Sequence, residues 1–208
     1  DGDGYVENDV PVEFCSLSLP TDYIDIPQAQ NYGLQFDGND QVIIPDHTDL
    51  RIIGDITVEV WFTLDQIVND WIRLVGKGAS GPRNYGMWVH PVSNQLLFQQ
   101  YGGGGNLFVR IYDFPTELNR WYHAVGVKEG NSAKLYLDGE LVATQNNIGD
   151  TTPHTSGDPL TIGYAGYHSY HRGNIDEVRI WNVARSESEI QNNMNSGLSG
   201  YEEGLVAY

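Results

Sequence analysis

The residues best suited to ligand chemistry gather in one short segment, residues 164–172. It reads YAGYHSYHR, so three tyrosines, two histidines and one arginine follow one another closely. Flat aromatic rings suit the apolar face of a pyranose, and the neighbouring polar groups can hydrogen-bond to its hydroxyls. This composition favours a carbohydrate-binding loop with six candidate contact residues, namely Tyr164, Tyr167, His168, Tyr170, His171 and Arg172.

An aromatic-rich loop also has a purely structural interpretation. Tyrosine and histidine side chains are often partly or fully buried in folded proteins. The same segment could therefore be a plug that covers one end of a domain. Its large share of polar groups favours binding, but the sequence leaves both interpretations open.

A second group of candidate contact residues comes from three successive segments, and its members are Trp71, Tyr85 and Tyr101. Trp71 follows the polar pair Asn69 and Asp70, which favours exposure of its ring. Other polar and aromatic residues of the same segments could complete a concave face with them, namely Trp88, His90, Gln99 and Gln100.

The remaining tryptophans are expected in the core. Trp88 lies between Met87 and Val89, and large aromatic residues in such apolar runs are more often core residues than ligand platforms. The same assignment is made for three others, Trp61, Trp121 and Trp181.

The common catalytic patterns are absent from the sequence. Retaining glycosidases need two carboxylates about 5–5.5 Å apart, which residues i and i+2 of one strand can supply. Here Glu59 stands alone in its segment, whereas Asp176 and Glu177 are adjacent and would point to opposite faces of a strand. There is also no HExxH zinc motif and no GxSxG nucleophile motif. We therefore predict that the chain is not an enzyme.

A polysaccharide lyase is the catalytic alternative that remains. His168, Tyr170, His171 and Arg172 could act as a base and as a neutraliser of the carboxylate of a uronic acid. Catalytic roles are usually drawn from several separate elements. The crowding of these four residues in one loop speaks against this alternative.

The charge balance excludes other classes of partner. The chain has 28 Asp and Glu against 11 Lys and Arg, for a net charge of −17. Such a chain repels a phosphate backbone or an anionic bilayer, so neither nucleic acid nor membrane is an expected partner. Neutral polysaccharides or oligosaccharides are favoured over acidic ones, unless Arg83, Arg110 and Arg172 form a local positive patch.

The N-terminal segment differs from the rest of the chain. Residues 1–9, DGDGYVEND, place carboxylates around glycines with the spacing of a loop that wraps a hard cation in oxygen ligands. Residues 10–30 contain three prolines and no clean periodicity, and the single cysteine, Cys15, excludes an internal disulfide. We predict that residues 1–30 are a linker remnant and extended lead-in, cut from a longer precursor, and that residues 31–208 form one domain.

The elements that must position the candidate residues are short strands. From residue 31 onward, alternating apolar runs are separated by clusters of Gly, Pro, Asn and Asp, as in β-sandwiches. In residues 55–62 the apolar side chains Ile56, Val58, Val60 and Phe62 share one face, which predicts a strand with one face in the core. The candidate loop 164–172 would connect two such strands.

Three further elements have clear local signals. Asp138-Gly139 supplies the positive-φ residues of a tight turn, which predicts a hairpin over Ala133–Thr144. Ser186 and Glu189 have capping-box spacing and predict a short helix over Ser186–Met194. The apolar residues 204–208 predict a final edge strand.

The order of these segments resembles the laminin-G-like jelly-roll domains of the concanavalin-A-like lectin and glucanase superfamily. The resemblance covers residues 31–208 and rests on an ordered set of segments: LQFDG at 34–38, residues 56–62, NYGMW at 84–88, RWYHAV at 120–125, LYLDG at 135–139, LTIG at 160–163 and GNIDEVRIW at 173–181. It implies an all-β fold, a two-sheet antiparallel jelly-roll sandwich with one short C-terminal helix. It says little about the ligand, because this fold carries lectins, glycosidases, lyases and adhesion modules alike.

The resemblance also implies a calcium ion, since members of the family often bind one with an Asp of the last strand and oxygens near the first. The matching residues here are Asp176 and Asp37, and Ca²⁺ would need further oxygens from backbone and water. The alternative is that Asp37 stabilises a turn and that Asp176 pairs with Arg179 or Arg172.

The sequence and the resemblance together predict a non-catalytic, calcium-dependent module that binds a polysaccharide or oligosaccharide. We expect it to be secreted or displayed at the cell surface, and to be joined to other domains of the same chain, such as a polysaccharide-degrading enzyme. The alternative is an adhesion or spacer domain of a bacterial surface protein.

Overall fold

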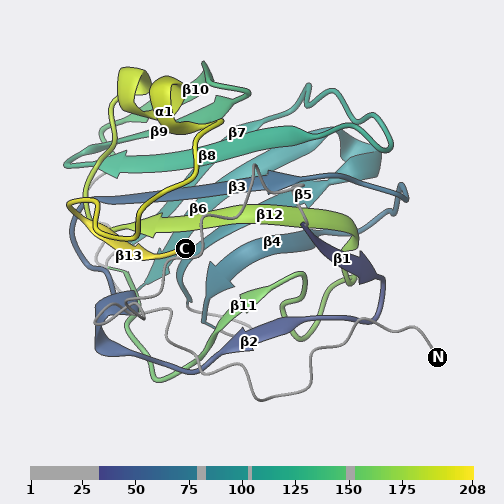
Figure 1. Cartoon of the computed structure of the whole chain (residues 1–208), viewed down its shortest axis with the longest axis horizontal. Coiled ribbons are helices and arrows are strands. Elements are labelled where there is room, and N and C mark those ends of the chain that lie inside the picture. Colours follow the sequence, from purple (N-terminus) through teal and green to yellow (C-terminus); the bar gives the residue numbers. More distant parts are fainter. Residues whose placement is uncertain (1–32, 79–82, 103–104, 149–152) are drawn as a thin grey trace.

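The structure is a computed structural model that describes residues 33–78, 83–102, 105–148 and 153–208 (Figure 1). The predicted linker and lead-in at residues 1–30, the acidic loop at residues 1–9 and Cys15 lie outside the described residues.

Two antiparallel sheets face each other and form a sandwich (Figure 1). Sheet A has the strand order β1-β12-β3-β8-β9-β10, with β13 paired to β12. Its strands are β1 (Leu34–Asp37), β3 (Ile56–Phe62), β8 (Tyr122–Glu129), β9 (Ser132–Leu137), β10 (Glu140–Asn146), β12 (Arg172–Trp181) and β13 (Leu205–Ala207). Sheet B has the order β2-β11-β4-β5-β6-β7. Its strands are β2 (Val42–Ile44), β4 (Ile72–Lys77), β5 (Arg83–His90), β6 (Gln95–Gly102), β7 (Gly105–Ile111) and β11 (Leu160–Ile162).

This architecture confirms the predicted all-β jelly-roll sandwich. Helical structure in the described part of the chain amounts to α1 (Glu187–Asn193) and two 3₁₀ turns, Thr48–Leu50 and Pro91–Ser93. None of the helices among the described residues is long and apolar enough to cross a membrane.

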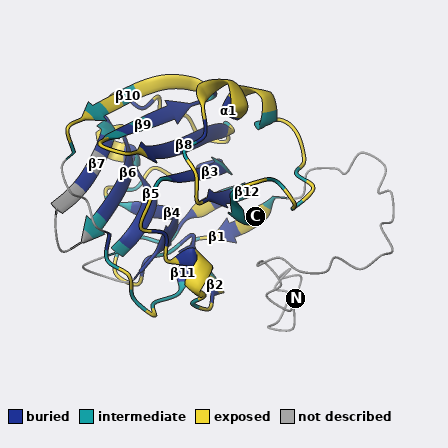
Figure 2. Cartoon of the chain, turned by 90° about the vertical axis from the view of Figure 1, so that its left-hand side faces the viewer, coloured by how far each residue is buried: buried dark blue, intermediate teal, exposed yellow. Residues whose placement is uncertain are grey.

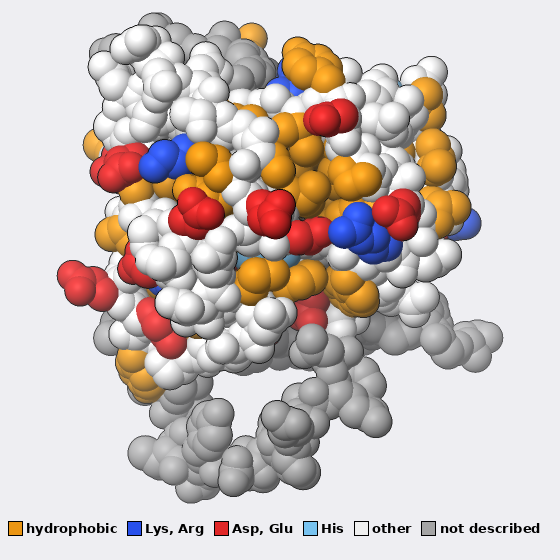
Figure 3. All heavy atoms as spheres, turned by 90° about the horizontal axis from the view of Figure 1, so that it is seen from above, with side chains coloured by type: hydrophobic (Ala, Val, Ile, Leu, Met, Phe, Trp, Pro, Cys, Tyr) orange, Lys and Arg blue, Asp and Glu red, His pale blue; other side chains and the backbone are white. Residues whose placement is uncertain are grey.

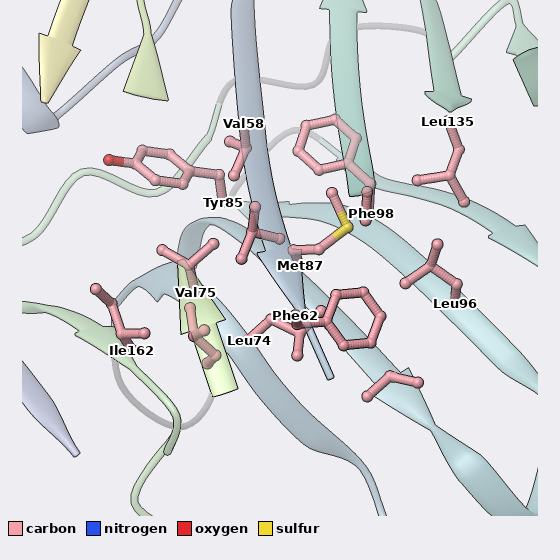
Figure 4. Close-up of a cluster of buried hydrophobic side chains, with 14 of the residues drawn as sticks. Val58, Phe62, Leu74, Val75, Tyr85, Met87, Leu96, Phe98, Leu135 and Ile162 are labelled. Atoms are coloured by element: carbon pink, nitrogen blue, oxygen red, sulfur yellow. The ribbon is translucent and has the colours of Figure 1, made fainter. Parts of the chain in front are cut away.

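The main hydrophobic core lies between the two sheets. Ile56, Val58, Val60 and Phe62 of β3 are all fully buried in it, which confirms the predicted alternation of that strand. Figure 4 shows Val58 and Phe62 facing side chains of sheet B such as Tyr85 and Met87. The sandwich is therefore held together by the period-two pattern of its strands.

Sheet A is also covered on its outer side, where α1 packs. The outward residues of β8 and β9 form a second cluster with one residue of α1: Val125, Val127, Tyr136 and Ile190. The helix begins with the predicted capping box, in which the Ser186 side chain accepts from the Glu189 backbone and the Glu189 side chain accepts from the Ser186 backbone. In Figure 2 the strands beneath the helix are buried, whereas β10 and much of α1 are exposed.

The other local predictions are confirmed as well. The β9–β10 hairpin turns at Asp138 (φ 50°) and Gly139 (φ 83°), the left-handed pair of a two-residue turn. Strand β13 pairs with β12 at the edge of sheet A.

Of the three tryptophans assigned to the core with Trp88, the assignment is confirmed for Trp181 and is wrong for Trp61 and Trp121. Trp181 is fully buried, and Trp61 is half-buried and stacked on His123. Trp121 has 40% of its surface exposed, because it precedes β8 at the rim of sheet A instead of lying within the strand.

Candidate functional site

The outer face of sheet B carries a row of four side chains in register across four strands. Arg73 of β4 pairs with Trp88 of β5, Trp88 with Leu97 of β6, and Leu97 with Arg110 of β7. Adjacent strands lie about 4.8 Å apart, so the backbones of the two arginines are about 14 Å apart with Trp88 and Leu97 between them.

A pair of glycines makes room for the centre of this row. Gly76 and Gly86 are cross-strand partners on β4 and β5. A Cβ atom at Gly86 would lie 2.7 Å from Nε1 of Trp88, and one at Gly76 would lie 3.1 Å from Nε of Arg73. The indole and the guanidinium thus lie over backbone that bears no side chains, and Cζ of Arg73 is 4.7 Å from the centre of the Trp88 ring.

Arg73 is a buried cation. It is 1% exposed, and its Nη1 donates to the Gly78 carbonyl at 2.8 Å and to Oγ1 of Thr161 at 2.9 Å. Burial lowers the pKa of Arg73 to about 10, so the guanidinium still carries its charge at neutral pH.

The predicted loop 164–172 covers part of this face, between β11 and β12. Ala165 packs on Trp88 and Leu97, with Trp71 at the edge of the cluster. Tyr167 and His168 lie over the indole of Trp88, with ring centres 6.3 Å and 5.8 Å from it. The loop is therefore partly the cover that the structural interpretation expected and partly an exposed surface, since 39% of Tyr167 is accessible.

Asp70 anchors the loop to the start of β4. Its Oδ1 lies 2.8 Å from Nδ1 of His168, and its Oδ2 accepts from the Ser169 hydroxyl at 3.1 Å. Burial alone would raise the pKa of Asp70, but hydrogen bonds from the Trp71 backbone, His168 and Ser169 lower it below the usual value. Asp70 is therefore ionised at neutral pH.

Arg83 connects the loop to the far end of β6. Its guanidinium lies 5.0 Å from the centre of the Trp88 ring, 5.6 Å from Tyr101 and 5.8 Å from Tyr167, and its Nη1 donates to the Tyr167 hydroxyl. With its amide oxygen turned toward them, Gln99 accepts from both Arg83 and Nε1 of Trp88.

Trp71 and Arg110 form a second group of contacts on the outer face of sheet B. Cζ of Arg110 is 5.3 Å from the centre of the Trp71 ring and 5.6 Å from that of Tyr112, which is 67% exposed. His90 packs edge-on against Trp71 at 5.2 Å. We call the whole set the arginine–aromatic band: Trp71, Arg73, Arg83, Trp88, Tyr101, Arg110, Tyr112, Tyr167 and His168.

The band brings together four of the nine predicted contact residues and adds residues that the sequence did not indicate. Trp71, Tyr101, Tyr167 and His168 belong to it, as do Arg83 and Arg110, two of the three arginines considered for a local positive patch. The third, Arg172, lies at the cavity beside the loop instead. Arg73 and Tyr112 were missed, and Trp88 lies on the outer face under the loop instead of in the core between the sheets.

Two residues that were predicted to contact the ligand are buried, so that prediction is wrong for them. Tyr85 is fully buried in the main core, because it shares its strand face with Met87 and Val89. His171 is also fully buried, 5.6 Å from the Phe36 ring, and burial lowers its pKa to about 4. Neither side chain can reach a ligand on the surface.

The remaining loop residues, Tyr164, Tyr170 and Arg172, have other neighbours than the band residues. Tyr164 and Tyr170 stack face to face, 3.6 Å apart. Tyr170 and Arg172 line a cavity of about 300 Å³, together with Gly38, Gln66, Val68, Ile72 and Ser169. Nε of Arg172 donates to the Asp37 carbonyl at 2.7 Å. This cavity is a second place where the loop can take up a small polar group.

The predicted calcium ligands do not converge. Asp37 pairs with Arg172 across β1 and β12, whereas Asp176 lies four residues further along β12, about 13 Å away along the strand. Oδ1 of Asp37 accepts from the Asn39 backbone at 3.1 Å, as the turn alternative expected. Oδ1 of Asp176 accepts from the Glu177 backbone at 2.8 Å, and burial raises the pKa of Asp176. The pair does not fit one shared ion, and no group of three acidic, histidine or cysteine residues suited to a metal occurs in the part of the chain that the structure describes.

Solved structures with the same fold come from proteins of several kinds. A Bacteroides ovatus protein, to which carbohydrate binding has been provisionally assigned, matches with a TM-score of 0.66 and 22% identity over 86% of this chain and 51% of its own. The LG4-5 domains of the mouse laminin alpha1 chain match with a TM-score of 0.56 and 15% identity over 71% of this chain and 40% of theirs. A Trypanosoma rangeli sialidase matches with a TM-score of 0.55 and 22% identity over 76% of this chain and 26% of its own.

These similarities show the fold, and the chain spans about half the length of the Bacteroides ovatus protein and less of the other two. No curated protein sequence matches the chain. A family model does match, over residues 36–191, and the fold agrees with it. The chain belongs to the concanavalin A-like lectin/glucanase superfamily.

Proposed function

We propose that the protein is a non-catalytic carbohydrate-binding module and that the arginine–aromatic band is its binding surface. The proposal rests on the outer face of sheet B, because exposed aromatic rings alternate there with hydrogen-bonding side chains. Tyr167 and Tyr112 are 39% and 67% exposed, and Trp71 is half-buried between Arg110 and His90. Ring faces of this kind stack on sugars while guanidinium and amide groups bind the hydroxyls.

The wider context of the module belongs to the same proposal. The chain would be one part of a secreted or surface-displayed protein, joined to other domains such as a polysaccharide-degrading enzyme. Two findings support this context: the family is lectin-like, and the Bacteroides ovatus protein with provisionally assigned carbohydrate binding is about twice as long as the segment matched.

A polysaccharide affinity screen tests the proposal. The affinities of the wild-type protein and of the variants Tyr167→Ala and Trp71→Ala are measured for a set of soluble glycans. We expect each substitution to weaken binding about tenfold, equivalent to about 1.4 kcal/mol of lost stacking. Tyr201→Ala is the matched control, because Tyr201 is 72% exposed and lies outside the band.

The outcomes separate the proposal from its main alternative. Loss of binding in both band variants but not in Tyr201→Ala supports the module and locates its site. A folded wild-type protein that binds none of the glycans contradicts the proposal and favours an adhesion or spacer domain.

Calcium dependence is also part of the proposal, on the strength of the family resemblance and the excess of carboxylates. It does not rest on Asp37 and Asp176, which lie too far apart to share an ion. The test is the Tm with CaCl₂, with a chelator, and with NaCl at the ionic strength of the CaCl₂ sample. A larger rise in Tm with CaCl₂ supports a bound ion, and an equal rise contradicts it.

A lyase is the second candidate, because one contact favours it. His168 lies 2.8 Å from Asp70 and next to Tyr167, whose hydroxyl accepts from Arg83. An imidazole, a phenol and a guanidinium close together are groups that β-elimination from a uronic acid can use. The test is to incubate the protein with alginate or polygalacturonate and to measure the ultraviolet absorbance of unsaturated sugars. If no new absorbance develops, the lyase activity is contradicted.

A further inference from the structure

We infer that the arginine–aromatic band binds glycans that carry acidic groups, carboxylates or sulfates, and that Arg83 and Arg110 contact those groups. This inference rests on the proposed function and names the class of ligand for the same site. It departs from the preference for neutral glycans that net charge alone suggests.

Ion pairs are unevenly distributed among the basic side chains. The chain has only 11 basic side chains against 28 acidic ones, so each cation could find a carboxylate. Six of them do so within 4 Å among the described residues: Arg51, Lys77, Arg120, Lys128, Lys134 and Arg179. Arg73, Arg110 and Arg172 belong to none of these ion pairs. Arg73 lies against Trp88 beneath the loop 164–172, Arg110 packs against Trp71, and Arg172 is the last residue of the loop. Arg185 is also outside these ion pairs, and it stacks on Trp181 beneath the start of α1.

Arg73 carries a buried charge whose hydrogen bonds are incomplete. A charge that is removed from water normally has a counter-charge or a full set of hydrogen bonds, because desolvation is costly. Arg73 is 1% exposed, and its Nε and Nη2 have no hydrogen-bond partner among the described residues. Its charge is therefore only partly compensated and adds to the positive potential over Trp88.

The two partly accessible cations of the band, Arg83 and Arg110, have a geometry that suits acidic groups. Arg83 and Arg110 are half-buried on opposite sides of the Trp88–Leu97 centre, each packed against aromatic rings. Arg110 also donates to Oε1 of Gln95 at 3.2 Å. Packing against aromatic rings and Gln95 restrains both guanidinium groups while leaving part of each accessible, and a planar guanidinium suits bidentate binding of a carboxylate or a sulfate.

Asp70, a carboxylate at the edge of the band, does not cancel this charge. Asp70 accepts from His168, Ser169 and the Trp71 backbone, so its oxygens are directed to the loop. A ligand with acidic groups would thus supply a counter-charge to Arg110, which is in no ion pair within the described ranges of the chain. Its sugar rings would stack on Trp71, Tyr112 and Tyr167.

Matched pairs of polymers test the inference, because each pair differs only in charge. Polygalacturonate is compared with its methyl-esterified form for carboxylates, and carrageenan with its desulfated form for sulfates. We expect the charged member of at least one pair to bind tenfold or more tightly than its uncharged partner. Arg83→Gln and Arg110→Gln should each remove most of that difference.

Two further variants serve as controls. Arg120→Gln removes an arginine that is paired with Asp138 at 2.9 Å on sheet A, so binding should stay at the wild-type level. Arg110→Lys keeps the charge but loses the planar donor geometry, so it should retain only part of the preference. The Tm of each variant shows whether it is folded.

The outcomes distinguish this inference from the proposed function. Equal binding of the charged and uncharged members, unaffected by Arg83→Gln and Arg110→Gln, overturns the inference and leaves the carbohydrate-binding function standing. No binding of any polymer by folded wild-type protein overturns both. A charge preference that Arg120→Gln removes as effectively as Arg110→Gln overturns the assignment of the contacts to the band.

Discussion

Trp88 and Tyr85 show what alternation along a strand reveals about single residues. Both lie on β5, and the period of two places Tyr85 with Met87 and Val89 but Trp88 with Gly86. Residue type alone suggested the reverse assignment, with Tyr85 at the ligand and Trp88 in the core. The alternation was the signal that could have corrected it, because a strand with glycine on one face leaves that face free for a flat side chain.

Gly86 is the residue on which the position of Trp88 most depends. In Gly86→Ala the new Cβ would lie 2.7 Å from Nε1 of Trp88, so the indole must move away from Gln99 and Arg83. We expect a loss of about 1–3 kcal/mol of stability from overpacking, together with a shift of the tryptophan fluorescence. The matched control is Gly54→Ala, where the new Cβ meets nothing within 4 Å. Equal effects of the two substitutions on fluorescence would contradict the role of Gly86.

The buried His171 predicts a pH dependence of folding. Burial lowers its pKa in the folded state to about 4, whereas the unfolded value is about 6.5. Above pH 6.5 the His171 imidazole is neutral in both the folded and the unfolded state. Below pH 6.5 it is protonated first in the unfolded state, because its pKa is higher there. Stability is therefore complete above pH 6.5 and decreases as the pH falls toward 4.

Between pH 7.5 and pH 5 this group should account for about 2 kcal/mol of the loss in the free energy of unfolding, measured by urea denaturation. His171→Gln should lack that part of the loss, and His47→Gln should keep it, because His47 is exposed. The same pH dependence in all three proteins would show that His171 is not the group responsible.

At the scale of elements, local signals were sufficient wherever a turn or a cap decides the structure. The Asp138-Gly139 hairpin and the capping box of α1 depend on a few neighbouring residues, and both are present as predicted. The band depends instead on the register of β4, β5, β6 and β7 and on where the loop after β11 crosses them. Those pairings bring together residues far apart in the sequence, and no local pattern encodes them.

One buried arginine adds to the packing of Ile190 in attaching α1 to sheet A. Arg179 of β12 is 1% exposed and donates to the carbonyls of Asn193 and Ser196 at 2.9 Å and 2.7 Å, just where α1 ends. It also pairs with Glu177 at 2.6 Å and lies 3.7 Å from the buried Glu59. The single side chain thus connects the helix end to the sheet and neutralises a buried carboxylate.

Removing this arginine should be costly. We expect Arg179→Met to lower the free energy of unfolding by about 3–5 kcal/mol, because Glu59 would lose its nearest arginine. Glu59→Gln combined with Arg179→Met should recover part of that loss. Arg185→Met is the control, since Arg185 is similarly buried but stacks on Trp181 and has no carboxylate partner among the described ion pairs. A double variant no more stable than Arg179→Met would contradict the pairing.

At the scale of the whole molecule, charge is separated between the band and the rest of the surface. The net charge is −17, and in Figure 3 acidic side chains are more widespread than basic ones on the face seen from the side of β10 and α1. The three arginines of the band are concentrated on the outer face of sheet B. The net charge therefore predicted the acidic character of the average surface, but it did not predict the arginines that are concentrated in the band.

This separation predicts that salt acts in opposite directions on folding and on binding. Raising NaCl from 0.05 to 0.5 M screens the repulsion among the excess carboxylates, so the Tm should rise, by about 2–4 °C for each kcal/mol gained. Over the same range the binding of polygalacturonate or carrageenan should weaken, because the attraction to Arg83 and Arg110 is screened as well. Their uncharged derivatives are the control and should bind independently of salt. Binding of the acidic polymers that strengthens with salt would mean that the net charge, and not the local arginines, governs the approach of the ligand.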